Sequence, residues 1–317
     1  MSDTSEFFKL AISAAGFTPP EHIRQGKLQR FSSNGRRTDT SGWCRLFRDG
    51  RAGVFGDFRS GVTHVWVAKD EKPPTLVQRQ QRFIEIQRAK AEAAAEQSIQ
   101  WAQAANKNAG LWAESFPVAH HDCVDRYLSA RGIHLECWPG ALHYHPSLEY
   151  WQDGRCIGHL PAMIAEVTDL AGLRVSLHRT YLTHDGQKAN VEIVKKLTAS
   201  SARLAGCSIK LGQPSVIKGL STIAVAEGIE TALACHAAST MPTVSAISAN
   251  GVERYQWPDE VQQLVVFADN DISQVGQKAA AALADRARSR GLKVGVLTPP
   301  DSGTDWADVW AAQEGGI

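Results

Sequence analysis

The stretches STIAVAEGIETALA, at residues 221–234, and LVVFADND, at residues 264–271, decide the fold of this chain. In each, an apolar run typical of a buried strand ends in acidic residues, Glu227 in the first and Asp269 and Asp271 in the second. Ligands bind beyond the carboxyl ends of the strands in an open α/β sheet. Three carboxylates meeting there repel one another unless a divalent cation lies between them. The two stretches therefore predict Mg²⁺ and phosphate chemistry.

Each piece alone also has a purely structural explanation. An acidic residue after a strand often caps the next helix, and Asp-x-Asp is common in loops. Together, the glutamate-glycine turn that opens a helix (EGIETALA) and the later strand ending in Asp-x-Asp resemble the Toprim domain of bacterial primases, topoisomerases and related nucleases. The resemblance covers residues 220–317 and implies a Rossmann-like domain with a mostly parallel sheet. It implies that Glu227 is a metal ligand or general acid/base, and that Asp269 and Asp271 hold Mg²⁺, with Mn²⁺ as the alternative.

A third acidic motif follows the turn PPDSG. Members of the family often carry a Lys-Asp-Trp-Asn-Asp-like sequence here, whereas this chain has Thr304 in place of the lysine and Ala307 in place of the asparagine. Asp305 and Asp308 are three residues apart and share one helical face, so both could complete a metal-binding cleft. The alternative is a capped terminal helix with solvated acids.

The region before the Toprim-like stretch carries a second resemblance. YLSARGI, LHYHP, PAMIAEVTDLAGLRVSLHRTYLTHDGQKA and KKLTAS leading into CSIKLG are similar to the region that precedes the Toprim domain in primases of plasmids, phages and integrative elements. That region forms the basic half of the polymerase cleft in the family, so the resemblance implies residues that bind nucleotide or template. They are Arg179, Lys188, Lys195, Lys196 and Lys210, with Ser248 and Asn250 in a turn after TVSAIS. Ordinary solvated charges on a β-ribbon, and a tight turn, are the alternatives.

The net charge of +1 conceals opposite local charges. Residues 24–59 carry nine Lys/Arg and three Asp/Glu, and residues 171–218 carry eight and two. Residues 221–317 carry six Lys/Arg and twelve Asp/Glu. Two basic segments before an acidic one suit a protein that holds polyanions with the first two and metal ions with the last.

The N-terminal segment predicts a short helix and then a small antiparallel sheet. KLQRFS, GWCRLF, AGVFGDF and THVWVA are rich in aromatic and β-branched residues and are separated by turn sequences. Cations that track phosphates and aromatic rings that stack on bases predict a single-strand binding surface. Its residues are Arg24, Lys27, Arg30, Arg36, Arg37, Trp43, Arg59 and Trp66. A half-buried sheet with a solvated basic face is the alternative; GWCRLFRDGRAGVFGDFRSG is also similar to the N-terminal part of the same mobile-element primases.

Four segments follow from these patterns. We expect a small β-rich basic domain at residues 1–72, a long helical linker at 73–115, a mixed α/β basic subdomain at 116–219 and a Toprim catalytic domain at 220–317. The linker is rich in strong helix formers and has no proline beyond residue 74. Its polarity on most faces favours a spacer.

Several classes of site and location are disfavoured. The six cysteines form no C-x-x-C pair and the histidines lack partners at ligand spacing, so no zinc is predicted. No apolar run approaches the ~20 residues that span a bilayer, and the start lacks the form of a signal peptide, so we expect a cytoplasmic protein without membrane contact. No G-x-x-x-x-G-K-[ST] loop is present, so a replicative helicase would be a separate partner, as would a single-strand-binding protein.

The sequence therefore predicts a primase-like enzyme of DNA replication, of the kind that plasmids, phages and other mobile genetic elements encode. Such an enzyme would join ribonucleoside triphosphates into short RNA primers on a single-stranded DNA template by metal-dependent nucleotidyl transfer. Because the same metal site can activate water, a Toprim nuclease is the alternative within enzymology. A non-catalytic DNA-binding replication accessory is the alternative outside it.

Overall fold

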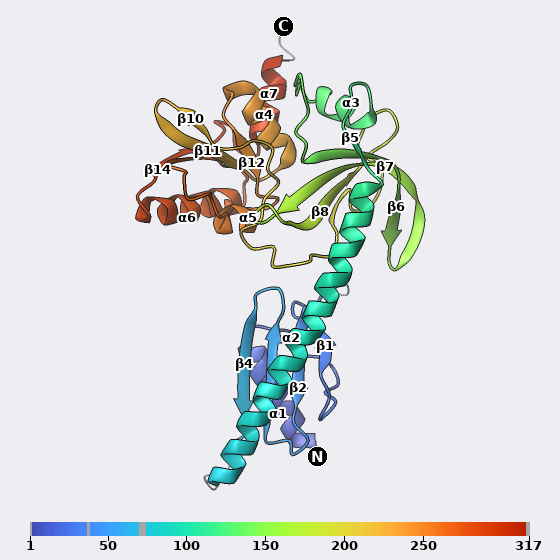
Figure 1. Ribbon diagram of the computed structural model, residues 1–317, viewed down its shortest axis with the longest axis vertical. Coiled ribbons are helices and arrows are strands. Elements are labelled where there is room, and N and C mark those ends of the chain that lie inside the picture. Colours follow the sequence, from blue (N-terminus) through green and yellow to red (C-terminus); the bar gives the residue numbers. More distant parts are fainter. Residues whose placement is uncertain (1, 37–38, 70–73, 315–317) are drawn as a thin grey trace. The chain divides into compact units, whose positions relative to one another are not determined.

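The computed structural model describes residues 2–36, 39–69 and 74–314 (Figure 1). The chain divides into two compact units, Met1–Ala102 and Gln103–Ile317. One long helix, α2 (Leu76–Ala113), runs from the first unit into the second and confirms the single helix expected between the basic segments. Arg37, one of the expected DNA-binding residues, lies outside the described residues. None of the described helices has the length and apolar character needed to cross a bilayer.

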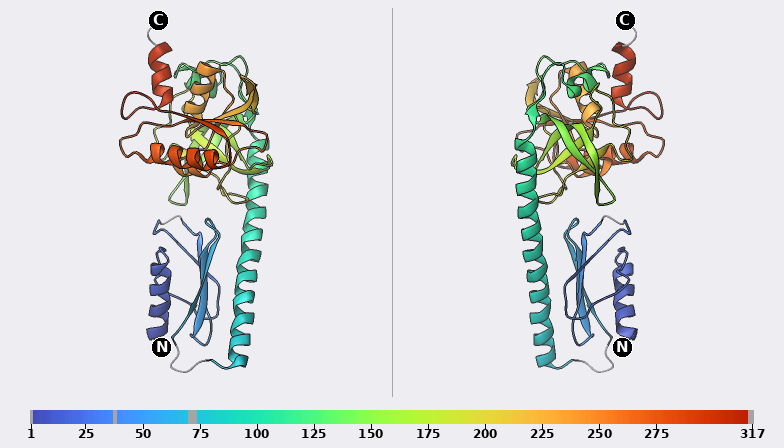
Figure 2. Two further views of the ribbon diagram at one scale, coloured as in Figure 1. Left: turned by 90° about the vertical axis from the view of Figure 1, so that its left-hand side faces the viewer. Right: turned by 90° about the vertical axis from the view of Figure 1, so that its right-hand side faces the viewer.

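The first unit is an antiparallel sheet between two helices, α1 (Ser2–Ala14) and the first part of α2 (Figure 2). Its strands follow chain order: β1 (Gln29–Phe31), β2 (Gly42–Leu46), β3 (Ala52–Asp57) and β4 (Val62–Val67). The expected small sheet is confirmed. Its strands are short and β-branched or aromatic, which suits pairing on a pleated surface.

Helices cover both faces of this sheet over β2 and β3, whereas Val62, Val65 and Val67 of β4 are exposed. Phe8 and Ile12 of α1 pack against Phe31 and Phe55 on one face. Ala89 and Ala93 of α2, together with Trp43, Phe47 and Val54, form the core on the other face. The first part of α2 therefore completes the core of the first unit, since its small alanines let the helix approach the sheet closely.

The second unit begins with an antiparallel sheet in the order β5-β6-β7-β8-β9. The strands are β5 (Phe116–Pro117), β6 (Leu142–Gln152), β7 (Arg155–Thr168), β8 (Arg174–Tyr181) and β9 (Lys195–Leu197), and α3 (Cys123–Ser129) lies between β5 and β6 in sequence. Asp122 caps α3 by accepting the backbone N–H groups of Val124 and Asp125. The strands expected at ALHYHP, PAMIAEV and LRVSLHRTYL are confirmed.

The mostly parallel sheet of the second unit carries the acidic motifs. Central β11 (Leu220–Ala226) pairs in parallel with β12 (Thr243–Ser245) and with β13 (Gln263–Phe267). On the far side of β13, β14 (Lys293–Leu297) is also parallel. The short β10 (Ser215–Ile217) is antiparallel to β11. The helices are α4 (Ile229–Ser239), α5 (Ala249–Arg254), α6 (Val275–Ser289) and α7 (Trp306–Glu314). This is the α/β architecture that the sequence predicted for the C-terminal part.

One apolar core joins the two sheets of the second unit. It contains Leu142 and Met163 from the antiparallel sheet and Ala226 and Phe267 from the parallel sheet. The segment around Ile209 also bridges them, because Ser208 pairs with Thr168 at the end of β7 and Ile209 pairs with Ser245 of β12. The basic strands and the acidic strand ends thus belong to one compact unit.

Candidate active site

Glu227 and Asp269 leave the same edge of the sheet. They follow β11 and β13, which are adjacent parallel strands with Ala226 opposite Phe267. Because both strands run in the same direction, the residues after their carboxyl ends emerge side by side. Glu227 and Asp269 are therefore neighbours at one edge of the sheet.

Asp269 lies at the centre of the acidic cluster. Burial raises its pKa to about 7, and the charges of Glu227, Asp305, Asp271 and Asp308 add to the effect. Its Oδ1 is buried and has no hydrogen-bond partner in the part of the chain that the structure describes. A buried carboxylate oxygen without a partner costs free energy, which a cation bound at that atom would recover.

Both the carbonyl oxygen and the carboxyl group of Glu227 accept hydrogen bonds that position this residue. Burial raises the pKa of its carboxyl and the charge of Asp271 adds to this, while a hydrogen bond from the backbone N–H of Ala249 and the charge of Lys195 oppose it. Its carbonyl oxygen accepts the backbone N–H of Ile247, at 2.8 Å, and the hydroxyl of Ser245, also at 2.8 Å. The end of β12 and the segment after it therefore hold this glutamate through both its carbonyl and its carboxyl group.

Ile247, which sequence reasoning did not single out, contacts the backbone of Glu227. Its φ of +74° is an outlier for a β-branched side chain, and such strained positions cluster at active sites and ligand clamps. The conformation turns its N–H toward the Glu227 carbonyl. Nothing in the sequence signals it, because isoleucine at this position suggests only a continued strand.

Asp271 anchors the N-terminal end of α6. Its carboxylate accepts hydrogen bonds from the Ser273 hydroxyl and from the backbone N–H groups of Gly276, at 2.9 Å, and Val275, at 3.2 Å. The bond from Ser273 is the largest cause of a pKa below the usual aspartate value. Asp271 therefore stays ionised where Asp269 does not readily do so.

Asp305 and Asp308 form the helix cap that was one of the two alternatives for this motif. They cap α7 reciprocally: the N–H of Asp308 donates to Asp305, at 2.9 Å, and the N–H of Asp305 donates to Asp308, at 3.1 Å. The hydroxyl of Thr231 on α4 donates to Asp305 at 3.3 Å. Both acids also contribute to the raised pKa of Asp269, so the cap lies beside the cluster.

These five acids fit a hard divalent cation. Oxygen ligands suit Mg²⁺, which usually keeps several waters and takes only one or two carboxylates from the protein. Within the described part of the chain, no three of the five offer oxygens that all lie within 4.8 Å of one another. The cluster is thus open rather than a closed all-protein cage, and Asp269 with its unpartnered oxygen is the best-placed ligand.

Lys195 brings positive charge to this edge of the sheet. Its Nζ lies 2.8 Å from Oε2 of Glu230, a residue of α4 that is 7% exposed, and Tyr127 of α3 donates to Oε1 at 2.6 Å. Burial alone would raise the pKa of Glu230, but Lys195 and the hydrogen bonds outweigh burial and lower it to about 2. Burial, with the charge of Lys195, lowers the pKa of His178 to about 4.

The other basic residues expected on the antiparallel sheet lie elsewhere. Lys196 is next to Lys195 on β9 and therefore points to the opposite face. Its Nζ donates to the Trp151 carbonyl at 2.6 Å and lies 3.7 Å from the ring centroid of Tyr150. Arg179 donates to the carbonyl of Leu197 at 3.1 Å, and Lys188 is exposed.

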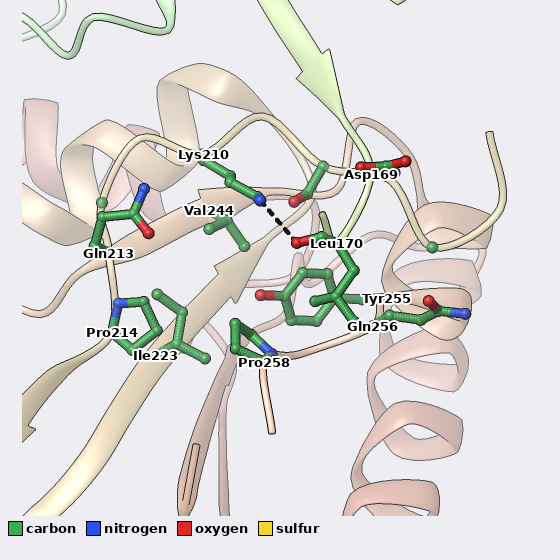
Figure 3. A pocket seen from close by; sticks show the side chains of 13 residues that line it. Asp169, Leu170, Lys210, Gln213, Pro214, Ile223, Val244, Tyr255, Gln256 and Pro258 are labelled. Carbon is green, nitrogen blue, oxygen red and sulfur yellow. Dashed lines mark hydrogen bonds between the residues drawn. The ribbon is translucent and has the colours of Figure 1, made fainter. Parts of the chain in front are cut away.

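Lys210 lies in a separate pocket lined by Leu170, Ile223, Val244 and Tyr255, among others (Figure 3). Its Nζ donates to the carbonyl of Leu170 at 3.3 Å. None of the five acids lines this pocket. Lys210 is therefore not brought to the acidic cluster.

The segment around Ser248 and Asn250 lies beside the acidic cluster, but it begins a helix instead of forming the expected turn. Both were expected in a turn, whereas Ser248 caps α5 by accepting the N–H of Gly251, and Asn250 lies inside that helix. Local reasoning favoured a turn because Asn-Gly is a strong turn signal. The glycine is required by packing instead: a Cβ at Gly251 would lie 1.8 Å from the carbonyl oxygen of Ala246.

The expected aromatic DNA-binding surface needs correction at Trp43. This residue is 4% exposed and stacks on Phe58 in the core beneath α2, so its ring is not available to a base. Trp66 is partly buried and packs against Phe8 of α1. The expectation assumed a sheet with one open face, whereas α2 covers the face that carries Trp43 and α1 packs on the face that carries Trp66.

Among the described basic residues that were expected to bind DNA in the first unit, two interact with other residues of the protein and three are exposed. Arg30 donates to the carbonyl of Thr40 and to Gln100, and Arg59 pairs with Asp39. The remaining described ones, Arg24, Lys27 and Arg36, are exposed.

A basic pocket that the sequence did not indicate lies between the β2–β3 turn and α2. Arg45, Arg48 and Arg88 line it together with Glu85. Arg45 pairs with Glu92, whereas Arg48 and Arg88 are exposed and form no ion pair within the described residues. The two arginines are 40 positions apart, so no local pattern could have grouped them.

Comparison with protein-family models finds one match for each of the two parts of the second unit. Residues 222–315 match the Toprim domain, and residues 102–208 match a domain of unknown function, DUF7146. No curated protein matches the chain.

Solved structures with similarity to this chain include three primases. A DNA primase domain from Pseudomonas aeruginosa has 16% identity and a TM-score of 0.37, with 53% of this chain and 52% of that chain covered. The primase fragment of the bacteriophage T7 primase-helicase has 16% identity and a TM-score of 0.37, with 63% and 76% covered. The Aquifex aeolicus primase, with zinc-binding and RNA polymerase domains, has 14% identity and a TM-score of 0.43, with 97% and 82% covered. This chain thus spans about half the length of the Pseudomonas structure.

Proposed function

We propose that this chain, whose residues 222–315 are a Toprim domain, is a primase. It joins ribonucleoside triphosphates into short RNA primers on single-stranded DNA, by nucleotidyl transfer that depends on Mg²⁺ or Mn²⁺. The catalytic acids are Glu227, Asp269 and Asp271, with Asp305 and Asp308 as further metal ligands. A separate helicase and a place in a mobile genetic element belong to the same proposal.

The observation that carries the proposal is the state of Asp269. Its carboxyl is partly buried near four other acids, and its buried Oδ1 has no hydrogen-bond partner among the described residues. Perturbed carboxyls of this kind are typical of functional sites. A divalent cation bound here would neutralise charge on phosphate oxygens, which is the main requirement of phosphoryl and nucleotidyl transfer.

Lys195 supports a role with nucleotides. Its ammonium is held by Glu230 beside the acidic cluster and its side chain remains 39% exposed. A lysine in this position can contact a triphosphate as a point charge while Glu230 fixes its place.

A priming assay tests the function. The protein is incubated with single-stranded DNA, all four ribonucleoside triphosphates, one of them labelled, and Mg²⁺ or Mn²⁺. We expect short RNA products whose sequence follows the template and which disappear with EDTA. Cleavage of DNA without synthesis would favour the Toprim nuclease instead, and neither product with either metal would favour the non-catalytic accessory.

The arginine pocket of the first unit is our proposed contact to the template backbone. We expect Arg48→Ala with Arg88→Ala to weaken binding of single-stranded DNA by the full chain. Each lost phosphate contact should reduce the slope of log K against log salt by about 0.7. Fluorescence anisotropy at several salt concentrations measures this.

Lys9→Ala is the matched control for Arg88→Ala. It removes one positive charge from α1, on the opposite side of the same sheet, where Lys9 pairs with Glu6 at 2.9 Å. Equal losses of affinity in the two single variants would show that only net charge matters, and would remove the pocket from the proposal.

A further inference from the structure

Three potential metal ligands of different kinds meet on the hairpin of β6 and β7. Glu149, Cys156 and His159 each offer one ligand atom, and these atoms all lie within 4.8 Å of one another. All three side chains are exposed, and none of them belongs to the acidic cluster. The proposed primase chemistry gives them no role.

A β-bulge creates this grouping. Glu149 is directly opposite His159 in the antiparallel register, and Trp151 is opposite Cys156. Cys156 and His159 are three residues apart, so in a regular strand their side chains would point to opposite faces. The register shift beside Tyr150 leaves Ile157 as an extra residue and returns Cys156 to the face of His159. Bulges that re-aim a side chain in this way are common next to functional sites.

The backbone that carries the three ligands is fixed from its other face. Leu148 and Tyr150, which flank Glu149, are buried in the core of the antiparallel sheet. The hydroxyl of Tyr181 donates to the Glu149 carbonyl at 2.9 Å. Ligands on a rigid strand pair lose little conformational freedom when an ion binds.

Glu149 is also oriented directly. The indole N–H of Trp151 donates to its Oε2 at 2.8 Å, which leaves Oε1 for an ion. Hydrogen bonds of this kind set the direction of metal-binding carboxylates and increase affinity.

The donor set identifies the class of ion. A thiolate, an imidazole and one carboxylate suit Zn²⁺, whereas Mg²⁺ prefers oxygen ligands alone. Ligand atoms around a tetrahedral Zn²⁺ lie about 3.5 Å apart, so the observed spacing needs only small side-chain rotations.

We propose that the β6–β7 hairpin binds one Zn²⁺ through Glu149, Cys156 and His159, with water as the fourth ligand. Binding forms the Sγ–Zn bond and releases the thiol proton to solvent, without oxidation or reduction. This site differs from the expectation of no zinc, which considered C-x-x-C pairs and histidine spacing but not a Cys-x-x-His pair brought to one face by a bulge.

Cobalt titration tests the site. Metal-stripped full-length protein is titrated with Co²⁺ in excess Mg²⁺, which occupies hard oxygen sites. We expect one equivalent of Co²⁺ to give a thiolate charge-transfer band that Zn²⁺ abolishes by displacement. The band should be lost in Cys156→Ser, and His159→Gln should weaken Co²⁺ binding by at least about tenfold.

Cys137→Ser is the matched control, because Cys137 is the other exposed cysteine. The band should persist in this variant, and circular dichroism should show that all variants are folded. The proposal is overturned if the parent shows no thiolate band, if the band survives in Cys156→Ser, or if Cys137→Ser removes it.

Discussion

Replacing Asp269 with asparagine is expected to make the metal-free protein more stable while abolishing its activity. In the parent, Asp269 must ionise while buried among Glu227, Asp271 and two further acids. Asparagine keeps the shape and removes the charge. We expect the free energy of unfolding in EDTA at pH 8 to rise by about 1–2 kcal/mol, after allowance for solvent screening.

The raised pKa of Asp269 determines how the difference in stability between the parent and Asp269→Asn depends on pH. The pKa of Asp269 is raised from 3.8 to about 7 in the folded protein. Its contribution to stability is therefore present in full below pH 4 and is lost as the pH rises through 7. The parent and Asp269→Asn should differ little at pH 4 and most at pH 8. Denaturant unfolding at both values, with EDTA, measures the difference.

Magnesium should reverse the order of stability. The ion relieves repulsion only where the acids are charged, so Mg²⁺ should stabilise the parent and have little effect on Asp269→Asn. Synthesis by the variant should fall at least about a hundredfold if Asp269 holds a catalytic ion. Asp285→Asn, a change at a carboxylate that is 80% exposed on α6, should alter none of these quantities. A variant that is less stable than the parent in EDTA at pH 8, or that still responds to Mg²⁺, would contradict the assignment.

Removing the charge of Lys195 should have the largest effect on stability. Lys195→Met leaves the carboxylate of Glu230, which is 7% exposed, without its counter-charge. Breaking a buried ion pair by removing one partner costs about 3–5 kcal/mol. We expect a loss of about 3 kcal/mol in urea unfolding at pH 7, because the lysine itself is partly exposed.

The slope of stability against pH should also change sign. In the parent the pKa of Glu230 is lowered from 4.5 to about 2, so its contribution is present above pH 4.5 and is lost as the pH falls toward 2. Without Lys195, burial raises the pKa of Glu230 instead, and the free energy of unfolding should fall as the pH rises.

Two further variants distinguish the loss of the Lys195–Glu230 ion pair from a general destabilisation of the fold. Adding Glu230→Gln to Lys195→Met should recover most of the loss, since Tyr127 can still donate to the amide oxygen. Lys196→Met is the matched control from the opposite face of β9, where the lysine donates to the Trp151 carbonyl, lies over the Tyr150 ring and pairs with no carboxylate among the described residues. An unchanged pH slope in Lys195→Met, or equal losses in the two lysine variants, would show that the pair does not stabilise the fold.

The fold of the C-terminal part was readable from local sequence. The apolar runs at 223–226 and 264–267 form β11 and β13, and the acids that follow them meet because parallel strands end at one edge. This inference needs only the two-residue period of a strand and the topology rule for α/β sheets. The long helix Leu76–Ala113 was equally accessible, because helix propensity accumulates over many residues.

The role of individual side chains was less accessible. Lys195 and Lys196 look equivalent in sequence, yet their opposite faces send one to Glu230 and the other to Trp151. Trp43 was expected on an open sheet face, and α2 covers it with alanines more than 40 positions away.

Sequence by itself indicated the small N-terminal sheet, the long helix and the two strands that end in acids, because strand alternation and helix propensity act over a few neighbouring residues. Only the tertiary structure decided which charges become neighbours: the burial that holds Asp269 partly protonated, the Lys195–Glu230 pair, and the bulge that brings Cys156 beside His159. These depend on contacts between distant segments and on exclusion of water, and neither is encoded in any short stretch of the chain.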